Sequence, residues 1–392
     1  MRVNKKRIGL ITPSLESGGA ERVMAITSQI LEREGYEVYI LIYDTENINY
    51  LYNGRIINLK SKPGNNVISK IYKRIQRIIK VSFYKYKYNL DSMISFLYSA
   101  NIVNYYSIGP SKRILSCRGY TDYILNGHRY SKFEKKIDSL IVQTDRMKND
   151  FINDFNFNES KLTVVNNPFN IDHIESKAQE NIELFLKRKF KDRNVICTVG
   201  SFKKDKGYWH LIKAFTLVKK AVPNSLLLFI GHRGEMEQLI KNMAKNTDYS
   251  NDIIFLGYQS NPFKYIAKSD LYVCSSLYEG FPNSLVEALA CGTPVLSTDC
   301  KTGPKEILHH SISELNNLEN IFYADYGVLV PRLDENIDFN LNNITAEERL
   351  LAHGIINTIS DFEKLKHYKL ISKERAKDFD SKSYKDNIKK WI

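Results

Sequence analysis

Two glutamates, Glu279 and Glu287, and one lysine, Lys206, are of the types and at the spacing that could bind a ligand. Glu279 and Glu287 flank the start of a predicted helix in the stretch DLYVCSSLYEGFPNSLVEALACGTPVLSTD, which runs from Asp270 to Asp299. The backbone amides at a helix start form its positive end, which favours an anion. Lys206 ends the loop GSFKKDKG, which follows another predicted strand. Together these residues predict a site for a phosphorylated ligand that also carries hydroxyl groups.

The local sequence explains how this helix start would form. Gly280 breaks the strand, and Pro282 can take the first helical position, where its missing N–H costs nothing. Glu287 lies in an otherwise apolar helix, so its carboxylate needs a hydrogen-bonding partner such as a ligand hydroxyl. Taken one at a time, Lys206, Glu279 and Glu287 could equally be ordinary solvated charges, because most charged side chains are exposed.

A glycine pair offers a second place for close approach to a ligand. Gly18 and Gly19 follow the predicted strand 7–12 and precede a helix from Ala20 to about Glu34. The same pair is common in ordinary strand-to-helix turns, so this alternative stays open. The pair lacks the G-x-G-x-x-G spacing of a dinucleotide site, and the Lys206 loop lacks the spacing of a Walker loop. The sequence therefore disfavours a nicotinamide-dependent enzyme.

Strands alternate with helices along the whole chain. The predicted strands are 7–12, 37–43, 55–59, 92–97, 113–117, 139–143, 162–165, 195–199, 225–230, 253–256, 271–273 and 295–297. Such alternation predicts parallel, doubly wound sheets, whose ligands bind beyond the carboxyl ends of the strands. The run Asn166–Asn170 (NNPFN) loses this periodicity and is the predicted domain boundary. The predicted fold class is α/β, with two Rossmann-like doubly wound domains facing across a cleft.

Four helical segments have predicted ends that a structure can check. They are a helix over 101–108, a helix from Asp145 capped by its own carboxylate, a charged helix over Ile171–Phe190, and a helical tail from Thr345. In the tail, Thr345 and Glu348 have the spacing of a capping box.

The composition limits the class of protein. The chain has 392 residues, 43% of them hydrophobic, which suffices for two cores, and its formal net charge of +13 predicts anionic partners. Its five cysteines are scattered without C-x-x-C spacing, which indicates free thiols of a reducing compartment. The apolar run at Ile8–Ile11 is too short for a signal peptide, and no window is long enough to span a membrane. We therefore expect a soluble cytoplasmic protein.

The stretch 60–88 is basic and contains no acidic residue. Its cationic residues are Lys60, Lys62, Lys70, Lys73, Arg74, Arg77, Lys80, Lys85 and Lys87. Isoleucines at helical spacing accompany them, at positions 68, 71, 75, 78 and 79, and tyrosines follow at 84, 86 and 88. A basic amphipathic helix of this kind suits an anionic membrane surface, or it packs its isoleucines on the sheet as an ordinary covering helix. Nucleic acid is the weakest alternative, because no recognition module accompanies the charge.

The block SSLYEGFPNSLVEALACGTPVLSTDCKTGPKEIL resembles the signature of family 4 glycosyltransferases, with Glu279 and Glu287 as the Glu-x7-Glu pair. The segments GGAERV, ISFLYSAN, VVNNPFN, GSFKKDKG, FLGYQSN and YGVLVP resemble further landmarks in family order, so the resemblance covers nearly the whole chain. It implies the GT-B fold and retention of the donor's anomeric configuration. It also implies an acceptor domain over 1–170, joined by a C-terminal helix at about 376–392, and a nucleotide-sugar donor domain over 171–375.

The resemblance implies roles for the site residues. Glu279 would contact donor sugar hydroxyls near the reacting carbon and Lys206 the diphosphate, so these two are the predicted catalytic residues. Glu287 would accept hydrogen bonds from the ribose hydroxyls. The other predicted donor-binding residues are Gly18, Gly19, Ser201, Gly280, Phe281, Pro282, Asn283, Ser284 and Leu285. No metal or other cofactor is expected, because a lysine and a helix dipole would stabilise the leaving diphosphate.

One departure from the family pattern concerns the Lys206 loop. Ser201 stands where the family usually carries an arginine. Lys203 or Lys204 could supply the missing cation, or the site binds diphosphate more weakly.

A second departure lies in the first domain. The histidine that many family members carry there is absent from the segment SCRGY, where Arg118 occupies the neighbourhood. Arg118 and Asn101 are predicted acceptor-side residues. His128, which we expect on a loop, is not assigned a role.

The GPKEIL variant of the signature resembles bacterial enzymes of capsule, O-antigen and exopolysaccharide assembly. The implied function is retaining transfer of a hexose or N-acetylhexosamine from a nucleotide sugar, UDP-linked, to a lipid-linked glycan acceptor. The implied location is the inner face of the cell membrane, with the stretch 60–88 as surface anchor. A nucleotide-sugar epimerase of the same fold and a non-catalytic membrane or nucleic-acid binding protein are the alternatives.

Overall fold

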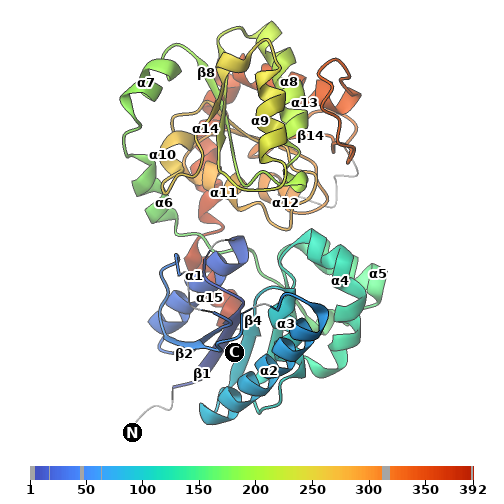
Figure 1. Ribbon diagram of the computed structural model, residues 1–392. Helices are drawn as coiled ribbons and strands as arrows, with labels where there is room; N and C mark the ends of the chain where they lie inside the picture. The colour runs from blue at the N-terminus through green and yellow to red at the C-terminus, as the bar shows by residue number, and fades with distance from the viewer. Residues whose placement is uncertain (1–4, 17, 45–47, 63, 311–317, 390–391) are drawn as a thin grey trace. The chain divides into compact units, whose positions relative to one another are not determined.

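The structure is a computed structural model that describes residues 5–16, 18–44, 48–62, 64–310, 318–389 and 392. The chain divides into unit 1, Met1–Pro168 with Ser381–Ile392, and unit 2, Phe169–Asp380. Each unit has a central, largely parallel sheet with helices on both faces (Figure 1), which confirms the predicted pair of doubly wound α/β domains. The sequence placed the two domain boundaries at 170/171 and 375/376, and the units change at 168/169 and 380/381.

Unit 1 contains a parallel seven-stranded sheet in the order β3-β2-β1-β4-β5-β6-β7. Its strands are β1 (Arg7–Thr12), β2 (Glu37–Ile42), β3 (Arg55–Asn58), β4 (Ser92–Ser95), β5 (Lys112–Ser116), β6 (Ser139–Val142) and β7 (Leu162–Val164). The strand order reverses between the neighbours β1 and β4. Doubly wound sheets bind ligands at such a switch point, beyond the carboxyl ends of the strands.

The helices of unit 1 cover both faces of this sheet. They are α1 (Gly19–Arg33), α2 (Val67–Lys87), α3 (Tyr98–Tyr106), α4 (Tyr120–Phe133), α5 (Asp145–Phe155), α15 (Ser381–Lys389) and the short 3-10 turns η1 (Glu134–Lys136) and η2 (Glu159–Lys161). Alternate strand residues enter opposite cores: Val38 and Ile40 of β2 join one cluster, and Tyr39 and Leu41 join the other. This period of two is expected for a strand that is buried on both faces.

Unit 2 repeats the arrangement with a seven-stranded sheet in the order β10-β9-β8-β11-β12-β14-β13. Its strands are β8 (Asn194–Val199), β9 (Ser225–Ile230), β10 (Ile253–Phe255), β11 (Leu271–Cys274), β12 (Val295–Thr298), β13 (Phe322–Ala324) and β14 (Gly327–Val330). The switch point lies between β8 and β11, which pair in parallel. The loops that follow these two strands carry Lys206 and Glu279.

The helices of unit 2 also lie on both faces. They are α6 (Ile171–Ala178), α7 (Leu184–Phe190), α8 (Tyr208–Ala221), α9 (Glu237–Lys245), α10 (Phe263–Ile266), α11 (Asn283–Ala290), α12 (Pro304–Leu308), α13 (Ala346–Ile359), α14 (Phe362–Lys377) and the 3-10 turns η3 (Lys204–Lys206) and η4 (Ser250–Asp252). The capping box at Thr345 and Glu348 is present at the start of α13 and confirms that prediction.

Several predicted element ends were wrong. The sheet of unit 2 does not end at Val295–Ser297, because β14 pairs with β12 and β13 folds back antiparallel to β14. The predicted helix Ile171–Phe190 is two helices, α6 and α7, and Ile182 between them is buried in the same core cluster as Ile174. Helix α3 starts at Tyr98 and ends at Tyr106, so its predicted bounds of 101–108 were also wrong.

Two local predictions also need correction. Thr144, not Asp145, caps α5: its hydroxyl accepts the N–H of Met147 at 3.1 Å. His128 lies on α4 and not on a loop, and its side chain is exposed.

All five cysteines are buried free thiols, as predicted. Among the described residues, no helix has both the length and the apolar character needed to cross a membrane.

Candidate active site

The loops after β8 and β11 are joined at the switch point of unit 2. The amide of Leu277 donates to the carbonyl of Asp205 at 2.8 Å, and the hydroxyl of Ser275 donates to the carbonyl of Lys206 at 2.9 Å. Gly207 has a φ of +58°, and a Cβ at this position would lie 2.4 Å from the carbonyl oxygen of Ser275. A side chain at Gly207 would therefore push the loops apart.

Lys206 and Glu279 form an ion pair across these two loops. The Lys206 Nζ donates to Glu279 Oε1 at 2.6 Å, and the Ser276 hydroxyl donates to the same oxygen at 2.7 Å. The two charged side chains are 20% and 12% exposed. Neither Glu279 Oε2 nor the two remaining N–H groups of Lys206 are bonded to a described residue. The pair therefore retains one acceptor oxygen and two donors that a ligand can use.

Burial and charge act in opposite directions on Lys206. Burial lowers the pKa of its ammonium. The charge and hydrogen bond of Glu279, together with the nearby Cys274 and Tyr208, raise it by more, so that the pKa lies above the ordinary value. Lys206 is therefore protonated throughout the neutral range. Burial raises the pKa of Asp205 in the same loop, and its Oδ1 is buried without a hydrogen bond to a described residue.

The start of α11 completes this part of unit 2. Pro282 is the N-cap of α11, so the prediction that it takes the first helical position was wrong by one residue, and no side chain caps the helix. The hydroxyl of Thr302 donates to the carbonyl of Glu279. Gly303 has a φ of +95°, and a Cβ there would lie 2.5 Å from Pro282 Cδ. The loop after β12 thus supports the turn Gly280–Pro282 from the side.

The side chains at the start of α11 have structural contacts of their own. The ring of Phe281 is 5% exposed and lies 5.4 Å, centroid to centroid, from that of Phe379. The Ser284 hydroxyl accepts from the Tyr272 hydroxyl at 2.7 Å, and Leu285 is fully buried. The amide of Leu285 bonds to the carbonyl of Pro282 at 3.0 Å, within the first turn of the helix. The side chains of Phe281, Ser284 and Leu285 are therefore used within unit 2.

The other predicted residues of unit 2 lie on α11 and in the Lys206 loop. Glu287 is on α11 and only 5% exposed. Ser201 is half-buried at the start of the Lys206 loop, whereas Lys203 and Lys204 are exposed. The amide of Lys204 is held by Glu235 Oε1 at 2.9 Å, so the loop after β9 fixes the backbone beside these two lysines.

In unit 1 the glycine pair forms the start of α1. Gly18 is the N-cap, with a φ of +123°, and a Cβ there would lie 2.4 Å from Glu21 Oε2. Its amide donates to the Tyr50 hydroxyl at 3.1 Å. Gly19 is the first residue of α1. No side chain caps the start of α1, and the ligand-binding role of the glycine pair stays a prediction.

Arg118 follows β5 in the sheet of unit 1. Its guanidinium donates to Asn167 Oδ1 and lies 5.7 Å from the centre of the Phe96 ring. Burial lowers the pKa of Arg118, and its Nε is buried without a hydrogen bond to a described residue. The sequence analysis did not predict Phe96 or Asn167 as site residues. Both follow strands of one sheet, β4 and β7, and this position beyond the strand ends could have identified them.

Asn101 does not fit its predicted acceptor-side role. It is fully buried, and its amide nitrogen donates to the Ser116 carbonyl at 2.7 Å and to the Tyr130 hydroxyl at 2.8 Å. Its Oδ1 accepts from the Ser95 hydroxyl at 2.7 Å and from the amide of Ser116 at 3.2 Å. All of its hydrogen-bonding capacity is used within unit 1, so Asn101 joins α3 to β4, β5 and α4.

Among the described residues, no group of three or more His, Cys, Asp and Glu side chains is arranged to hold a metal ion.

Residues 180–315 match the family described as glycosyl transferases group 1. An uncharacterized glycosyltransferase of Methanocaldococcus jannaschii is 34% identical over 275 residues, an alignment that covers 69% of this chain and 66% of that relative. The N-acetylgalactosamine-N,N'-diacetylbacillosaminyl-diphospho-undecaprenol 4-alpha-N-acetylgalactosaminyltransferase of Campylobacter jejuni is 27% identical over 388 residues, with 96% of both chains covered.

Solved structures show the same fold. Sucrose-phosphate synthase of Thermosynechococcus elongatus superposes with a TM-score of 0.76 at 16% identity, over 98% of both chains. The Anabaena protein HepE, in complex with UDP and glucose, superposes with a TM-score of 0.74 at 15% identity, also over 98% of both chains. Together with the group 1 match and the curated relatives, these likenesses identify the chain as a glycosyltransferase of the GT-B fold.

Proposed function

We propose that this glycosyltransferase moves a hexose or N-acetylhexosamine from a nucleotide sugar, UDP-linked, to a lipid-linked glycan, with retention at the anomeric carbon, as in family 4. The observation that carries the proposal is the Lys206–Glu279 ion pair beside the uncapped start of α11. The Campylobacter relative, whose name specifies a glycan on diphospho-undecaprenol, supports a lipid-linked acceptor in surface polysaccharide assembly.

In this proposal the residues of unit 2 divide the donor between them. Lys206 and the start of α11 hold the diphosphate, and the second oxygen of Glu279 accepts from a hydroxyl of the sugar to be transferred. Glu287 accepts from the ribose. The bond from the anomeric carbon to the diphosphate oxygen breaks, and the acceptor oxygen bonds to that carbon on the same face. The acceptor's proton leaves with the diphosphate, whose developing charge Lys206 stabilises.

Substitution at the ion pair tests this assignment. Glu279→Gln keeps the size of the side chain but loses its charge, and Lys206→Ala removes the cation from the diphosphate. We expect each to lower kcat/KM by at least about a hundredfold, as for other groups that stabilise developing charge. Lys220→Ala, which changes an exposed lysine at the end of α8, is the matched control. Near-normal transfer by either site variant, with the fold intact, would refute the assignment.

Product analysis separates the proposal from its alternatives. NMR of the product should show the anomeric configuration of the donor, whereas inversion would contradict retention. Turnover of the nucleotide sugar without any acceptor would favour an epimerase. We also propose that transfer needs no metal, because Lys206 and the helix start stabilise the leaving group. The rate should therefore survive EDTA, and loss of activity that Mg²⁺ or Mn²⁺ restores would contradict this part.

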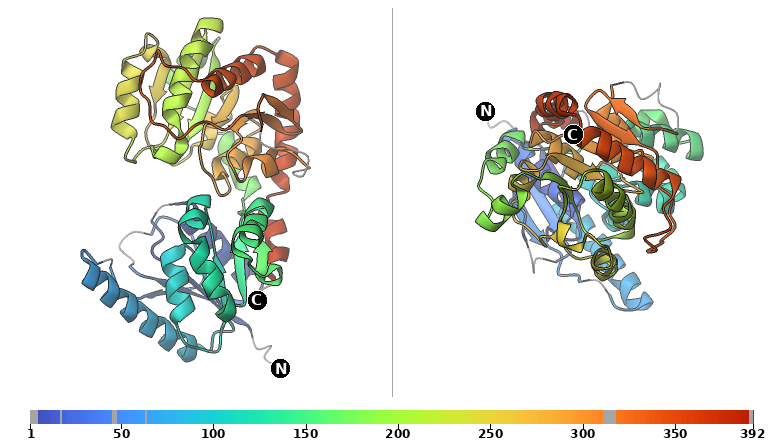
Figure 2. Two further views of the ribbon diagram at one scale, coloured as in Figure 1. Left: turned by 90° about the vertical axis from the view of Figure 1, so that its right-hand side faces the viewer. Right: turned by 90° about the horizontal axis from the view of Figure 1, so that it is seen from above.

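We further propose that unit 1 associates with the membrane surface through α2. A stripe of apolar side chains on this helix faces solvent, each at least 51% exposed: Ile68, Ile71, Tyr72, Ile75, Ile79, Phe83 and Tyr86. Of the five isoleucines in the stretch, only Ile78 packs against the core, so the reading of α2 as an ordinary covering helix does not account for the stripe. Figure 2 shows the N-terminal part of α2 reaching beyond the rest of unit 1.

The cations of α2 are not all available to anionic lipids. Lys85 is fully buried. Arg77 donates to Ser61 and stacks 3.9 Å from the Tyr43 ring, and Lys80 donates to the Leu59 carbonyl at 2.5 Å. These three hold α2 to the sheet, and Lys62 pairs with Asp44 at 3.8 Å. The cations of α2 proposed to meet a surface are therefore Lys70, Lys73 and Arg74.

Vesicle flotation tests membrane association. Ile71→Ser, Ile75→Ser and Ile79→Ser together should abolish binding to vesicles that contain anionic lipid, because they remove the apolar stripe and leave every charge in place. Ile124→Ser with Leu125→Ser is the control, since these residues are also exposed and apolar but lie on α4. Equal binding by the stripe variant and the wild type would exclude α2 as the anchor.

A further inference from the structure

The chain passes between its two units in an outward segment at 168–169 and a return segment at 379–381. These segments are bonded to each other within unit 2. The amide of Phe169 donates to the carbonyl of Phe379 at 3.1 Å, and Phe169 forms an isolated parallel β-bridge with Asp380. The first and the last residues of unit 2 are therefore held together.

The rings of both segments pack against the turn that follows Glu279. The Phe281 ring lies 5.4 Å, centre to centre, from that of Phe379 and 6.4 Å from that of Phe169. The three rings belong to one core cluster, and each is at most 7% exposed. Aromatic pairs at such separations attract each other by more than burial alone provides. The ring of Phe281 is therefore held by the two segments, while its backbone is part of the turn Gly280–Pro282.

Arg375, near the end of α14, joins the return segment to a second loop. Its Nε donates to the carbonyl of Ile307 at 2.8 Å, and its Nη2 donates to the carbonyl of Glu306 at 2.7 Å. Its Nη1 donates to Asp378 Oδ2 at 2.7 Å, and its Cζ lies 4.9 Å from the centre of the Phe379 ring. The planar, forked guanidinium suits several such partners at once, and here it links α12 to the return segment.

The start of α12 also contacts the turn that follows Glu279. Gly303 precedes α12, and a Cβ there would lie 2.5 Å from Pro282 Cδ. The hydroxyl of Thr302 donates to the carbonyl of Glu279. Two sets of contacts therefore lead from the end of α14 to this turn, one through the aromatic rings and one through α12. Because a close-packed interior transmits small shifts, the end of α14 and the turn should move together.

We propose that Phe379 and Arg375 are positioning residues of the donor site, which hold the turn after Glu279 in place and couple it to the return segment. Both act through the turn and not by contact with the donor. The proposal rests on the proposed function, in which Glu279 and the start of α11 hold the nucleotide sugar. Because coupling between two places is reciprocal, a ligand at the turn should also stabilise the bond between the outward and return segments.

Hydrogen exchange of the ligand-free protein tests the positioning. Phe379→Leu removes the ring but keeps an apolar side chain. The amides of α11 from Leu285 onward should then exchange about threefold faster or more, on the scale of a lost aromatic pair. Phe263→Leu is the matched control, because Phe263 is 6% exposed and belongs to the same core cluster, but lies on α10. It should leave the exchange of these amides unchanged.

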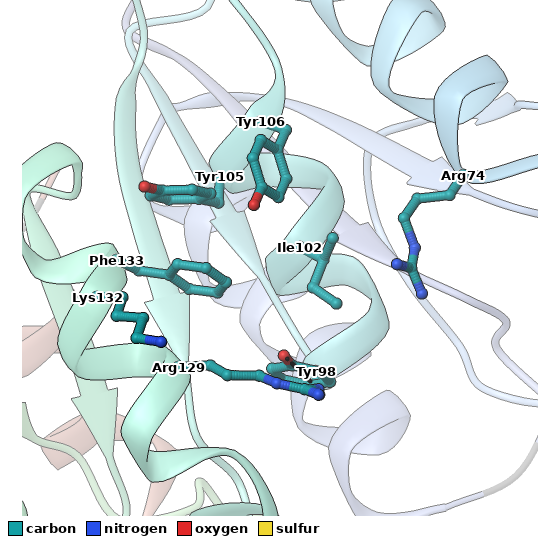
Figure 3. Close-up of a pocket in the computed structure, with 8 residues that line it drawn as sticks. All are labelled: Arg74, Tyr98, Ile102, Tyr105, Tyr106, Arg129, Lys132 and Phe133. Carbon is teal, nitrogen blue, oxygen red and sulfur yellow. Dashed lines mark hydrogen bonds between the residues drawn. The ribbon is translucent and has the colours of Figure 1, made fainter. Parts of the chain in front are cut away.

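A second control lies in unit 1. Phe133 is 7% exposed, like Phe379, and its ring stacks on that of Tyr105 with centres 4.0 Å apart. Both rings line a cavity of about 380 Å³ between α3 and α4 (Figure 3). Phe133→Leu therefore removes an equally buried ring from the other unit. It should not change the exchange of α11, which separates loss of the Phe281 contact from loss of an aromatic pair as such.

Binding of UDP tests the coupling to the donor, because UDP contains the diphosphate that the start of α11 is proposed to hold. Phe379→Leu and Phe281→Leu should each weaken UDP binding about tenfold, within the usual range of coupling between sites. The two changes combined should weaken it no further, since Phe379 acts through Phe281. Calorimetry measures affinity separately from the amount of binding-competent protein, so loss of folded protein alone would leave the dissociation constant unchanged.

Two further measurements address the return segment. Arg375→Lys keeps the charge but loses the forked donors, so it should also weaken UDP binding. In the wild type, UDP should slow exchange of the Phe169 amide, which is bonded to the Phe379 carbonyl. The same amide should not respond to UDP in Phe379→Leu, because the ring that connects it to the turn is missing.

Three results would overturn the proposal. Equal acceleration of α11 exchange by Phe379→Leu and Phe263→Leu would mean that any lost core ring loosens the helix. Unchanged UDP affinity in Phe379→Leu would mean that its ring does not set the donor site. Losses that multiply in the double variant with Phe281→Leu would show that the two rings act separately. Absence of UDP binding by the wild type would instead refute the UDP-linked donor of the proposed function, and the exchange comparison would still decide whether Phe379 positions the turn.

Discussion

Lys85 is a buried ammonium on α2 that forms no ion pair with a described carboxylate. Its Nζ donates to Asn104 Oδ1 at 3.0 Å. Burial, reinforced by Arg113 and only partly offset by Asp138, lowers the pKa of Lys85 from 10.5 to about 7. Between these two pH values the unfolded chain binds more protons at this residue than the folded chain does. The unfolding free energy of unit 1 should therefore rise with pH across this window.

Replacement of the lysine tests this account. In the wild type, Lys85 should make the unfolding free energy of unit 1 rise by at most about 1.4 kcal/mol per pH unit, and Lys85→Met should lack this rise. As the pH falls toward about 7, the unfolding free energy of the variant should therefore increase relative to that of the wild type. Urea denaturation at several pH values between about 7 and 10.5 measures this difference in unfolding free energy. Brief proteolysis at each urea concentration, followed by detection of fragments from unit 1, reports the unfolding of that unit separately. Lys70→Met, at an exposed position of the same helix, should run parallel to the wild type. A pH-independent difference for Lys85→Met would show that its charge does not change on folding.

At the scale of elements, the loop after β12 shapes the start of α11. Gly303→Ala would place a methyl group 2.5 Å from Pro282 Cδ, at a φ of +95°. We expect the turn Gly280–Pro282 to shift and transfer to fall by about a hundredfold, because misplacement by an ångström at a reacting group has this effect. Gly257→Ala is a matched control, with a φ of +69° and open space around the added carbon. Equal losses in kcat/KM would attribute the effect to backbone strain alone.

The helices and strands also show which parts of the fold and of the site the sequence patterns predicted. Apolar runs predicted both ends of β1 and β9 correctly, because strands covered on both faces are continuous apolar segments. The Glu-x7-Glu spacing located Glu279, and the loop GSFKKDKG located Lys206. Their contact depends on two loops that follow neighbouring strands, although the two residues are 73 positions apart in the chain. Strand β13 has an exposed Tyr323 and a short turn, so its apolar signal is weak. Asn101 was predicted to lie on the acceptor side because a sequence does not show which side chains have buried partners.

At the scale of the whole molecule, the C-terminal segment is part of unit 1. Helix α15 lies beside α1 (Figure 1), and the Tyr384 hydroxyl shares a 2.8 Å hydrogen bond with Thr27 Oγ1. Tyr384, Ile388 and Ile392 are buried in the core cluster that contains Ile8 and Leu10 of β1. The chain therefore passes from unit 1 to unit 2 and returns, and these three residues complete the core of the first unit.

Loss of this contact should destabilise one unit selectively. Tyr384→Ala leaves a cavity under α1 and should lower the stability of unit 1 by about 3 kcal/mol, as for other buried aromatic residues. Because two units need not unfold together, hydrogen exchange is a better measure than a single melting temperature. Amides of α1 and β1 should exchange faster, and those of β8 and β9 should not change. Ser383→Ala, at the exposed position just before Tyr384, should leave both sets protected. Faster exchange throughout both units would contradict the assignment of α15 to unit 1 alone, because its contacts would then stabilise the molecule as a whole.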